Sequence, residues 1–167
     1  MVSYSKPVPV SFTQTYDESC WAAVLESWSL SDTRLAIDPS KMGVPPSVQT
    51  SVIEEDSLCD AWGEGSTRKI TPTKLDKIAY ACSLRWKVLS SPSDTGQLLE
   101  DYIVAHLGRS YLFCAYTLRP DELHSVLIYR IHDGGASYMD PGDGGYYWCN
   151  FTWFHNRRKL IMMRRQQ

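Results

Sequence analysis

The sequence predicts an α+β fold in which a helical N-terminal half packs on an antiparallel sheet formed by the C-terminal half. Apolar residues recur at helical spacing in segments that precede residue 108. After residue 110, short stretches rich in β-branched and aromatic residues alternate with Asp, Gly and Pro turn signals. Helices first and strands afterwards are typical of α+β proteins and not of alternating βαβ units.

Composition and charge indicate a globular protein. Of the 167 residues, 43% are apolar and 22% are charged, which excludes a disordered chain and a coiled coil. No repeat or long linker divides the sequence, so we expect a single domain over residues 1–167. The formal net charge of −2 gives no general affinity for nucleic acid, and no stretch approaches the roughly 18 apolar residues of a membrane span. We therefore expect neither a nucleic acid nor a membrane as partner.

The first predicted helix runs from about Cys20 to Leu30, with Ser19 as its N-cap candidate. The apolar residues at the spacing of one helical face are Trp21, Val24, Leu25 and Trp28. Between Ser31 and Ser66 the chain has several Pro and Gly residues and weak periodicity, so we expect loops around one short helix near Val48 to Leu58.

Two further helices are predicted before the strands. One follows Thr71 and has Pro72 in its first turn, a position that proline favours. The next begins at Asp94 and Gln97, which resemble a capping box, and ends at Gly108. Five strands are then expected, at Tyr111–Leu118, Leu123–Ile131, Ala136–Asp140, Tyr146–Trp153 and Lys159–Met163.

The five cysteines form no Cys-x-x-Cys pair and are odd in number, which argues against a zinc site and against a complete disulfide framework. We interpret them as reduced thiols, four of them small core residues. Cys20 differs because it begins a predicted helix, where the helix dipole and a neighbouring imidazolium favour the thiolate. Gln14 lies six residues upstream, where its amide and the backbone N–H of Cys20 could both donate to an oxyanion.

Among the four histidines, His124 opens a strand directly after a loop and so presents its ring at the rim of the sheet. The other three occupy positions typical of capping or solvated histidines: His106, His132 and His155. Asp140 ends the next strand, so its carboxylate could orient the imidazole. A strict two-residue turn at Asp133 and Gly134 would instead place Asp143 opposite His124. A bulge or a larger loop among Asp133, Gly134 and Gly135 would favour Asp140.

Together, Gln14, the segment Ser19-Cys20-Trp21-Ala22-Ala23, His124 and Asp140 resemble the papain-like cysteine peptidases in motif and order. The resemblance implies a papain-like fold with a central nucleophile helix. It implies that Cys20 is the nucleophile, His124 the general base and acid, Asp140 the orienting residue, and Gln14 with Cys20 the oxyanion hole. It implies no metal and no cofactor.

Within that family, the segments around His124 and Asp140 look most like small bacterial branches, namely double-glycine leader peptidases and papain-fold effector toxins. This resemblance implies an endopeptidase acting on a protein substrate, at a Gly-Gly-type site, and an immunity protein as a further partner. No apolar run follows the start of the chain, so we expect no ordinary secretion signal. The resemblance to effector toxins implies a protein that is cytoplasmic in the producing cell and is delivered by a specialised secretion system. The alternatives are a papain-fold amidase or deamidase acting on peptidoglycan or a side-chain amide, and a catalytically dead papain-fold binding module.

Overall fold

The computed structural model describes residues 3–62, 70–89, 95–120, 122–157 and 160–166. Within these ranges seven strands form one antiparallel sheet in the order β2-β7-β3-β4-β5-β6, and β1 pairs with the C-terminal end of β4. The strands are β1 (Tyr4–Ser5), β2 (Leu84–Leu89), β3 (Leu112–Arg119), β4 (Glu122–His132), β5 (Gly135–Asp140), β6 (Gly145–Asn150) and β7 (Leu160–Arg165).

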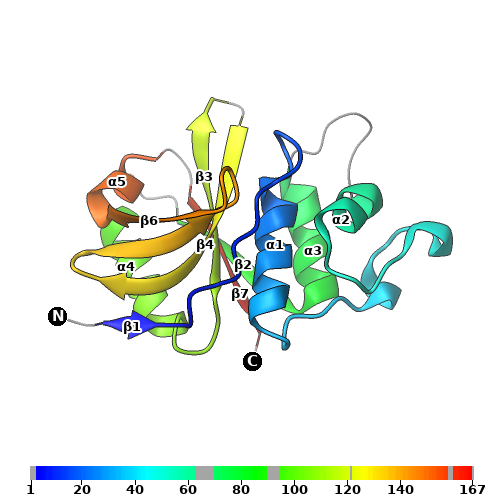
Figure 1. The fold of residues 1–167 in the computed structure, drawn as a ribbon, viewed down its shortest axis with the longest axis horizontal. Helices are drawn as coiled ribbons and strands as arrows, with labels where there is room; N and C mark the ends of the chain where they lie inside the picture. The colour runs from blue at the N-terminus through cyan, green and yellow to red at the C-terminus, as the bar shows by residue number, and fades with distance from the viewer. Residues whose placement is uncertain (1–2, 63–69, 90–94, 121, 158–159, 167) are drawn as a thin grey trace.

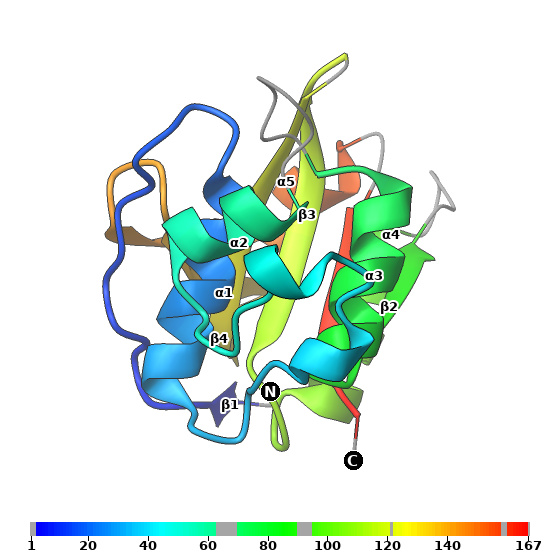
Figure 2. The same cartoon turned by 90° about the vertical axis from the view of Figure 1, so that its right-hand side faces the viewer.

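Helices cover both faces of this sheet (Figure 1; Figure 2). The α-helices are α1 (Cys20–Ser31), α2 (Glu55–Trp62), α3 (Pro72–Cys82), α4 (Thr95–His106) and α5 (Phe151–His155), and two 3₁₀ turns are η1 (Pro39–Lys41) and η2 (Pro46–Val48). One buried cluster joins α1, α2 and α3 to one face of the sheet, and a second joins α4 and α5 to the other face. The predicted α+β class is therefore confirmed, but α4 departs from the expected arrangement because it packs on the opposite face from α1.

Strand β3 shows why the sheet needs two helical layers. Phe113 and Ala115 belong to the cluster under α1, whereas Leu112 and Cys114 belong to the cluster under α4. A strand that is buried on both faces reads as a continuous apolar run and not as an alternating pattern. The apolar stretch in this part of the sequence thus reflects burial of β3 from both sides.

Helix α1 begins at Cys20, as the spacing predicts, and every residue from Cys20 to Trp28 is buried. The sequence predicted one apolar face, but the helix is covered all round because it lies against β4 on one side and α2 on another. A helix of this kind is an interior element. Ser19 stands at the N-cap position without a capping hydrogen bond, and its hydroxyl is used elsewhere, as described below.

The β4–β5 hairpin decides which side chains share a face. Asp133 and Gly134 both have positive φ and form a two-residue turn that pairs His132 with Gly135. The register then shifts by one residue between Ile128 and Arg130, so a bulge lies at Tyr129. The bulge or larger loop expected among residues 133–135 is therefore wrong in its place, because the turn there is strict and the bulge lies within β4. Its effect is to bring Asp140 onto the same face as His124.

An N-terminal strap, residues 6–14, runs from β1 to the loop before α1 (Figure 1). Its Lys6 N–H donates to the carbonyl of the bulge residue Tyr129 at 2.7 Å. Further along, Ser11 Oγ donates to the carbonyl of Gly144 at 2.6 Å. Gly144 has a φ of +72°, and a Cβ there would lie 2.7 Å from Ser11 Oγ, so glycine is required where the strap crosses the β5–β6 turn.

The helices predicted after Thr71 and before Gly108 are confirmed as α3 and α4. The Asp94 and Gln97 side chains, which we expected to form a capping box, lie outside what the structure describes. The short helix of the middle region, α2, begins at Glu55, seven residues later than the start predicted near Val48. Among the described residues, no helix combines the length and the apolar character needed to cross a membrane.

Strands β1 and β2, helix α5 and the two 3₁₀ turns were not predicted. Strand β2 forms an edge of the sheet, and the alternation of Leu84, Trp86 and Val88 with Arg and Lys residues was the signal for it. Strand β1 has only two residues, which is too short for a recognisable strand pattern in the sequence. The strand expected over Tyr146–Trp153 ends at Asn150, whose side chain accepts a hydrogen bond from Trp153 N–H at 2.8 Å and so caps α5.

Candidate active site

Cys20 lies where the N-terminus of α1 meets the beginning of β4. It is the first residue of the helix and is 3% exposed. Its thiol donates to the carbonyl oxygen of Leu123 at 3.7 Å, and Leu123 is the residue before His124. The fold therefore brings together two segments that are about one hundred residues apart in the chain, and the thiol sits at the positive end of a 12-residue helix.

His124 is held by Asp140 from the neighbouring strand. Its Nε2 lies 2.7 Å from Asp140 Oδ1, and the Gly142 N–H donates to the same oxygen at 2.8 Å. The two side chains are 14% and 23% exposed, so both are largely shielded from water. Because Nε2 is engaged by the carboxylate, Nδ1 is the ring nitrogen left for the thiol.

The protonation of His124 reflects these contacts. Burial disfavours its charged form, but hydrogen bonds with Asp140 and with Cys20 outweigh that effect and raise the pKa of His124 to about 10. The imidazole therefore keeps its proton at neutral pH. A protonated imidazole between a thiol and a carboxylate is the arrangement that favours a thiolate–imidazolium pair.

Asp143, the alternative partner of His124, is engaged within its own turn. Its Oδ1 accepts a hydrogen bond from the Gly145 N–H at 2.8 Å, and its Oδ2 accepts one from the Tyr147 hydroxyl. The hydrogen bond from Tyr147, followed by that from Gly145, lowers the pKa of Asp143. The structure thus places Asp140 and not Asp143 on the imidazole.

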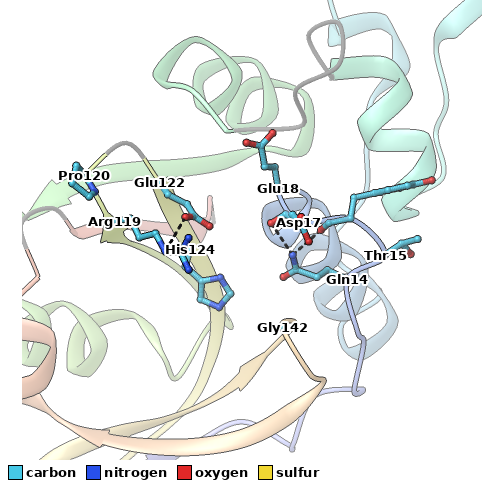
Figure 3. A pocket seen from close by; sticks show the side chains of 10 residues that line it. Gln14, Thr15, Asp17, Glu18, Arg119, Pro120, Glu122, His124 and Gly142 are labelled. Atoms are coloured by element: carbon cyan, nitrogen blue, oxygen red, sulfur yellow. Dashed lines mark hydrogen bonds and ion pairs between the residues drawn. The ribbon is translucent and has the colours of Figure 1, made fainter.

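Gln14 lies in the same site but donates its amide hydrogens to the loop. Its Nε2 donates to the carbonyls of Tyr16 at 2.7 Å and Asp17 at 3.0 Å (Figure 3). Its buried Oε1 has no hydrogen-bond partner among the residues that the structure describes. Its backbone N–H donates to Pro141 O at 2.7 Å, which ties it to the turn after Asp140. The structure therefore brings Gln14 to the site without aiming a free N–H into it.

Two adjoining cavities open over these residues. The larger has a volume of about 880 Å³ and lies between the segment 14–18 and the tip of the β3–β4 hairpin, with Gly142 at its base (Figure 3). The smaller, about 70 Å³, is lined by Cys20 and His124 together with Ile70 and Leu123. Residues shared by the two cavities are Asp17, Glu18, Glu122 and His124. A substrate chain lying in the larger cavity would therefore reach the thiol through the smaller one.

The remaining cysteines differ from Cys20 in their surroundings. Burial raises the pKa of both Cys82 and Cys114 to about 12, which keeps them as thiols. Cys59 is also buried, while Cys149 is half-buried, so the expected core role fits three of the four. Across the described part of the chain, no group of three His, Cys, Asp or Glu side chains is placed to hold a metal ion.

The other histidines lie outside the site or are not described in full. His132 contacts Asp133 and Ser137 at the opposite end of β4. His106 ends α4, where its ring packs against Tyr102. The side chain of His155 lies outside the described part of the structure.

Glu55 is a residue of this region that the sequence did not single out. It is the first residue of α2, is 3% exposed, and accepts hydrogen bonds from the Thr15 N–H and the Ser19 hydroxyl. An acidic residue in the first turn of a helix is ordinarily explained by the helix dipole. No local pattern could therefore reveal that this carboxylate is buried against a segment forty residues away.

Glu26 of α1, which accepts a hydrogen bond from the Glu55 N–H, gives a prediction about the stability of the fold. It is 8% exposed, and burial together with the nearby carboxylates Glu54, Glu55 and Asp56 raises its pKa to about 7, despite a hydrogen bond from the Glu55 N–H. Between pH 4.5 and 7 the unfolded chain releases this proton while the native chain retains it, so the free energy of unfolding falls across that range. We expect Glu26→Gln to raise the free energy of unfolding by up to about 3 kcal/mol at pH 8 and to change it little at pH 4.5.

Urea unfolding of the wild type and the variant at both pH values measures this difference. Asp60→Asn, at an exposed carboxyl group that is not among those raising the pKa of Glu26, is the control and should change the free energy of unfolding equally at the two pH values. A gain for Glu26→Gln that is the same at pH 4.5 and pH 8 would contradict the assignment.

Comparison with known proteins concerns the fold. No protein-family model matches the sequence, and the search of curated proteins found no match. The crystal structure of the peptidase domain of Streptococcus ComA, a bifunctional ABC transporter involved in a quorum-sensing pathway, is similar with a TM-score of 0.58 and 12% identity, over 94% of this chain and 98% of that chain. A double-glycine motif protease from an AMS/PCAT transporter, solved in complex with the leader peptide, gives a TM-score of 0.44 and 11% identity, over 99% and 100% of the two chains.

The similarity to the ComA domain extends over nearly the full length of both chains, although few residues are identical. A likeness at this level of identity concerns the backbone arrangement, because a fold does not by itself carry a function. The chain therefore has the fold of a papain-like cysteine peptidase domain, as the order of its sequence motifs indicated.

Proposed function

We propose that this protein is a cysteine endopeptidase in which Cys20 is the nucleophile, His124 the general base and acid, and Asp140 the residue that orients the imidazole. One observation carries the proposal: the Cys20 thiol at the N-terminus of α1 and the His124 imidazole line the same small cavity, and Nε2 of that imidazole lies 2.7 Å from Asp140 Oδ1. A thiol, an imidazole and a carboxylate in this spatial order are typical of enzymes that hydrolyse a bond through a covalent intermediate.

The first half of the reaction forms a thioester. Cys20 Sγ, as the thiolate, attacks the carbonyl carbon of the scissile peptide bond, and the carbonyl oxygen becomes an oxyanion. His124 then gives its proton to the nitrogen of the leaving amine, the C–N bond breaks, and the acyl group remains on Cys20. Asp140 keeps the ring oriented throughout and favours its charged form.

The second half releases the product and restores the site. A water molecule attacks the thioester carbon while His124 accepts its proton. When the second oxyanion collapses, the C–S bond breaks, the acid leaves, and the thiolate–imidazolium pair is restored. No metal or cofactor is required in either half.

Two groups are proposed to stabilise the oxyanions: the backbone N–H of Cys20 and the side-chain amide of Gln14. The first N–H groups of a helix have no partner within the helix, which makes Cys20 N–H a natural donor. Gln14 donates both amide hydrogens to loop carbonyls in this structure. Its proposed role therefore requires one of these bonds to be exchanged for the oxyanion during the reaction.

The substrate is proposed to be a protein cut after residues with small side chains, such as Gly-Gly. The support is the cavity of about 70 Å³ beside the thiol, which has room for about two water molecules at roughly 30 Å³ each. A large side chain next to the scissile bond does not fit there. The cavity of about 880 Å³ beyond it has room for several further residues of an extended chain.

We further propose that the protein acts as a bacterial effector that cleaves a cytosolic protein of a recipient cell and is neutralised by an immunity protein in the producer. This part rests on the motif resemblance to papain-fold effector toxins. Expression of the wild-type chain in a bacterial cytoplasm should arrest growth, whereas the Cys20→Ala chain should not. Equal growth of the two cultures would contradict the effector role.

Proteomic mapping of new protein N-termini tests the peptidase activity directly. Cells expressing the wild-type chain should contain cleavage products that are absent from cells expressing Cys20→Ala, with small residues before the cut. Incubation of the purified protein with peptidoglycan sacculi is the matched assay. Muropeptide release without any new protein N-terminus would contradict the peptidase proposal and support an amidase.

A further inference from the structure

The segment from Gln14 to Cys20 carries both groups that are proposed to act at the oxyanion, the side-chain amide of Gln14 and the backbone N–H of Cys20. It has no regular secondary structure before the helix begins, so other contacts must hold its shape. Within the segment, Ser19 Oγ accepts a hydrogen bond from Tyr16 N–H at 3.2 Å and lies 2.9 Å from the Tyr16 carbonyl. The carbonyl of Tyr16 is one of the two acceptors of the Gln14 amide.

A single carboxylate from α2 holds this segment near both ends. The Thr15 N–H lies 3.0 Å from Glu55 Oε1 and 2.9 Å from Oε2, and Ser19 Oγ lies 3.1 Å from Oε2. Thr15 is adjacent to Gln14, and Ser19 is adjacent to Cys20. Glu55 therefore contacts the residue next to each of the two groups that the oxyanion requires.

The Glu55 carboxylate is buried, and its helix is tied to α1. Glu55 is 3% exposed, and its own N–H donates to Glu26 Oε1 at 3.3 Å, which anchors the start of α2 to α1. Hydrogen bonds to a carboxylate are stronger than those between neutral groups. A buried charge is tolerated only where such bonds satisfy it, so the segment and Glu55 hold each other in one geometry.

We propose that Glu55 is a positioning residue that fixes the separation between the Gln14 amide and the Cys20 N–H, and thereby shapes the oxyanion hole. This inference rests on the proposed function. Glu55 contacts neither the thiol nor the imidazole in any hydrogen bond of the described structure. Its effect is therefore expected on the oxyanion and not on formation of the thiolate–imidazolium pair.

That distinction determines which measurements respond. An interaction that strengthens only in the transition state affects kcat and kcat/KM together and leaves KM unchanged. Alkylation of Cys20 by iodoacetamide displaces iodide and forms no oxyanion, so its rate reports the thiolate alone. Loss of kcat with an unchanged alkylation rate is a signature that a general structural defect would not give.

The test compares Glu55→Gln with Glu54→Gln in the full chain. The former keeps the shape of the side chain but replaces one acceptor oxygen with a donor, whereas the latter changes an exposed neighbouring carboxyl group. The substrate is a fluorogenic peptide that copies the cleavage site found by N-terminal mapping. For Glu55→Gln we expect a 10- to 100-fold loss in kcat, with KM and the alkylation rate within about twofold of the wild type.

Coupling to Gln14 completes the experiment. If Glu55 acts through the Gln14 amide, the double variant Gln14→Ala/Glu55→Gln should be little slower than Gln14→Ala alone. A kcat for Glu55→Gln equal to that of Glu54→Gln overturns the inference, and so does an equal loss of cleavage and alkylation.

If Glu55→Gln fails to fold by circular dichroism, Ser19→Ala is the second variant, because it removes the hydrogen bond between Ser19 and Glu55. It should show the same loss of kcat with an unchanged alkylation rate, and an unchanged kcat overturns the inference as well. A wild-type chain that neither cleaves nor is alkylated selectively at Cys20 refutes the proposed function instead.

Discussion

Replacing Cys20 with alanine is expected to abolish turnover, with a loss of about 10⁵- to 10⁶-fold in kcat, because no other group can form the covalent intermediate. Burial raises the pKa of both Cys82 and Cys114 to about 12, so neither of these thiols is suited to replace Cys20 as the nucleophile. The fold should survive, because removal of one sulfur atom at a helix N-terminus costs on the order of 1 kcal/mol. Single-turnover cleavage assays and thermal unfolding of the two proteins measure both quantities.

Cys82→Ala is the matched control for this variant. Cys82 is 3% exposed, as Cys20 is, but ends α3 and takes no part in the site. Its replacement should leave kcat unchanged, and an active-site thiol probe should label Cys20 and spare Cys82. Cleavage retained by Cys20→Ala would remove the basis of the mechanism, and equal labelling of the two cysteines would favour a binding module without catalysis.

Replacing Asp140 with alanine is expected to reduce kcat by about 10²- to 10⁴-fold, because the imidazole loses both its orientation and the nearby charge. Asp140→Asn should be milder, since the amide oxygen can still accept a hydrogen bond from His124 Nε2. Asp143→Ala should be near neutral, because Asp143 bonds Gly145 and Tyr147 and not the imidazole. A crippling effect of Asp143→Ala with an active Asp140→Ala would reverse the assignment.

The same variants predict a change in pH dependence. The pKa of His124 is about 10 despite burial, with the hydrogen bond to Asp140 as the leading cause that raises it. The imidazolium, which protonates the leaving amine, is lost as the pH rises through that value. Asp140→Asn lowers the pKa of His124, so the alkaline limb of kcat/KM should move to lower pH. An alkaline limb that stays in place would show that Asp140 does not set the charge of the ring.

Local patterns in the sequence were sufficient for α1, α3 and α4 and for most strands. The spacing of Trp21, Val24, Leu25 and Trp28 located α1, and Pro72 located the first turn of α3. Asp133 and Gly134 located the hairpin turn because both positions require positive φ. These signals act over a few residues, so they can be read without knowledge of the tertiary structure.

The candidate site was found in part by the same means. Cys20, His124 and Asp140 were chosen from their positions at the ends of expected elements, and the structure brings the three together. The choice between Asp140 and Asp143 was open, because it depends on the parity of the β4–β5 pairing. The bulge at Tyr129 decides that parity. The carbonyl of Tyr129 accepts a hydrogen bond from the N–H of Lys6 in the N-terminal strap.

The sequence by itself determined where α1 begins, which cysteine stands at its N-terminus, and which strands supply an imidazole and a carboxylate, because helix periodicity and turn chemistry are short-range properties. Only the tertiary structure decided that Asp140 faces His124, that Glu55 is buried against the segment before Cys20, and that α4 covers the second face of the sheet. Each of these depends on contacts between residues distant in the chain. Such contacts are selected by the shared burial of apolar surface and by the pairing of buried polar groups, and neither leaves a local pattern.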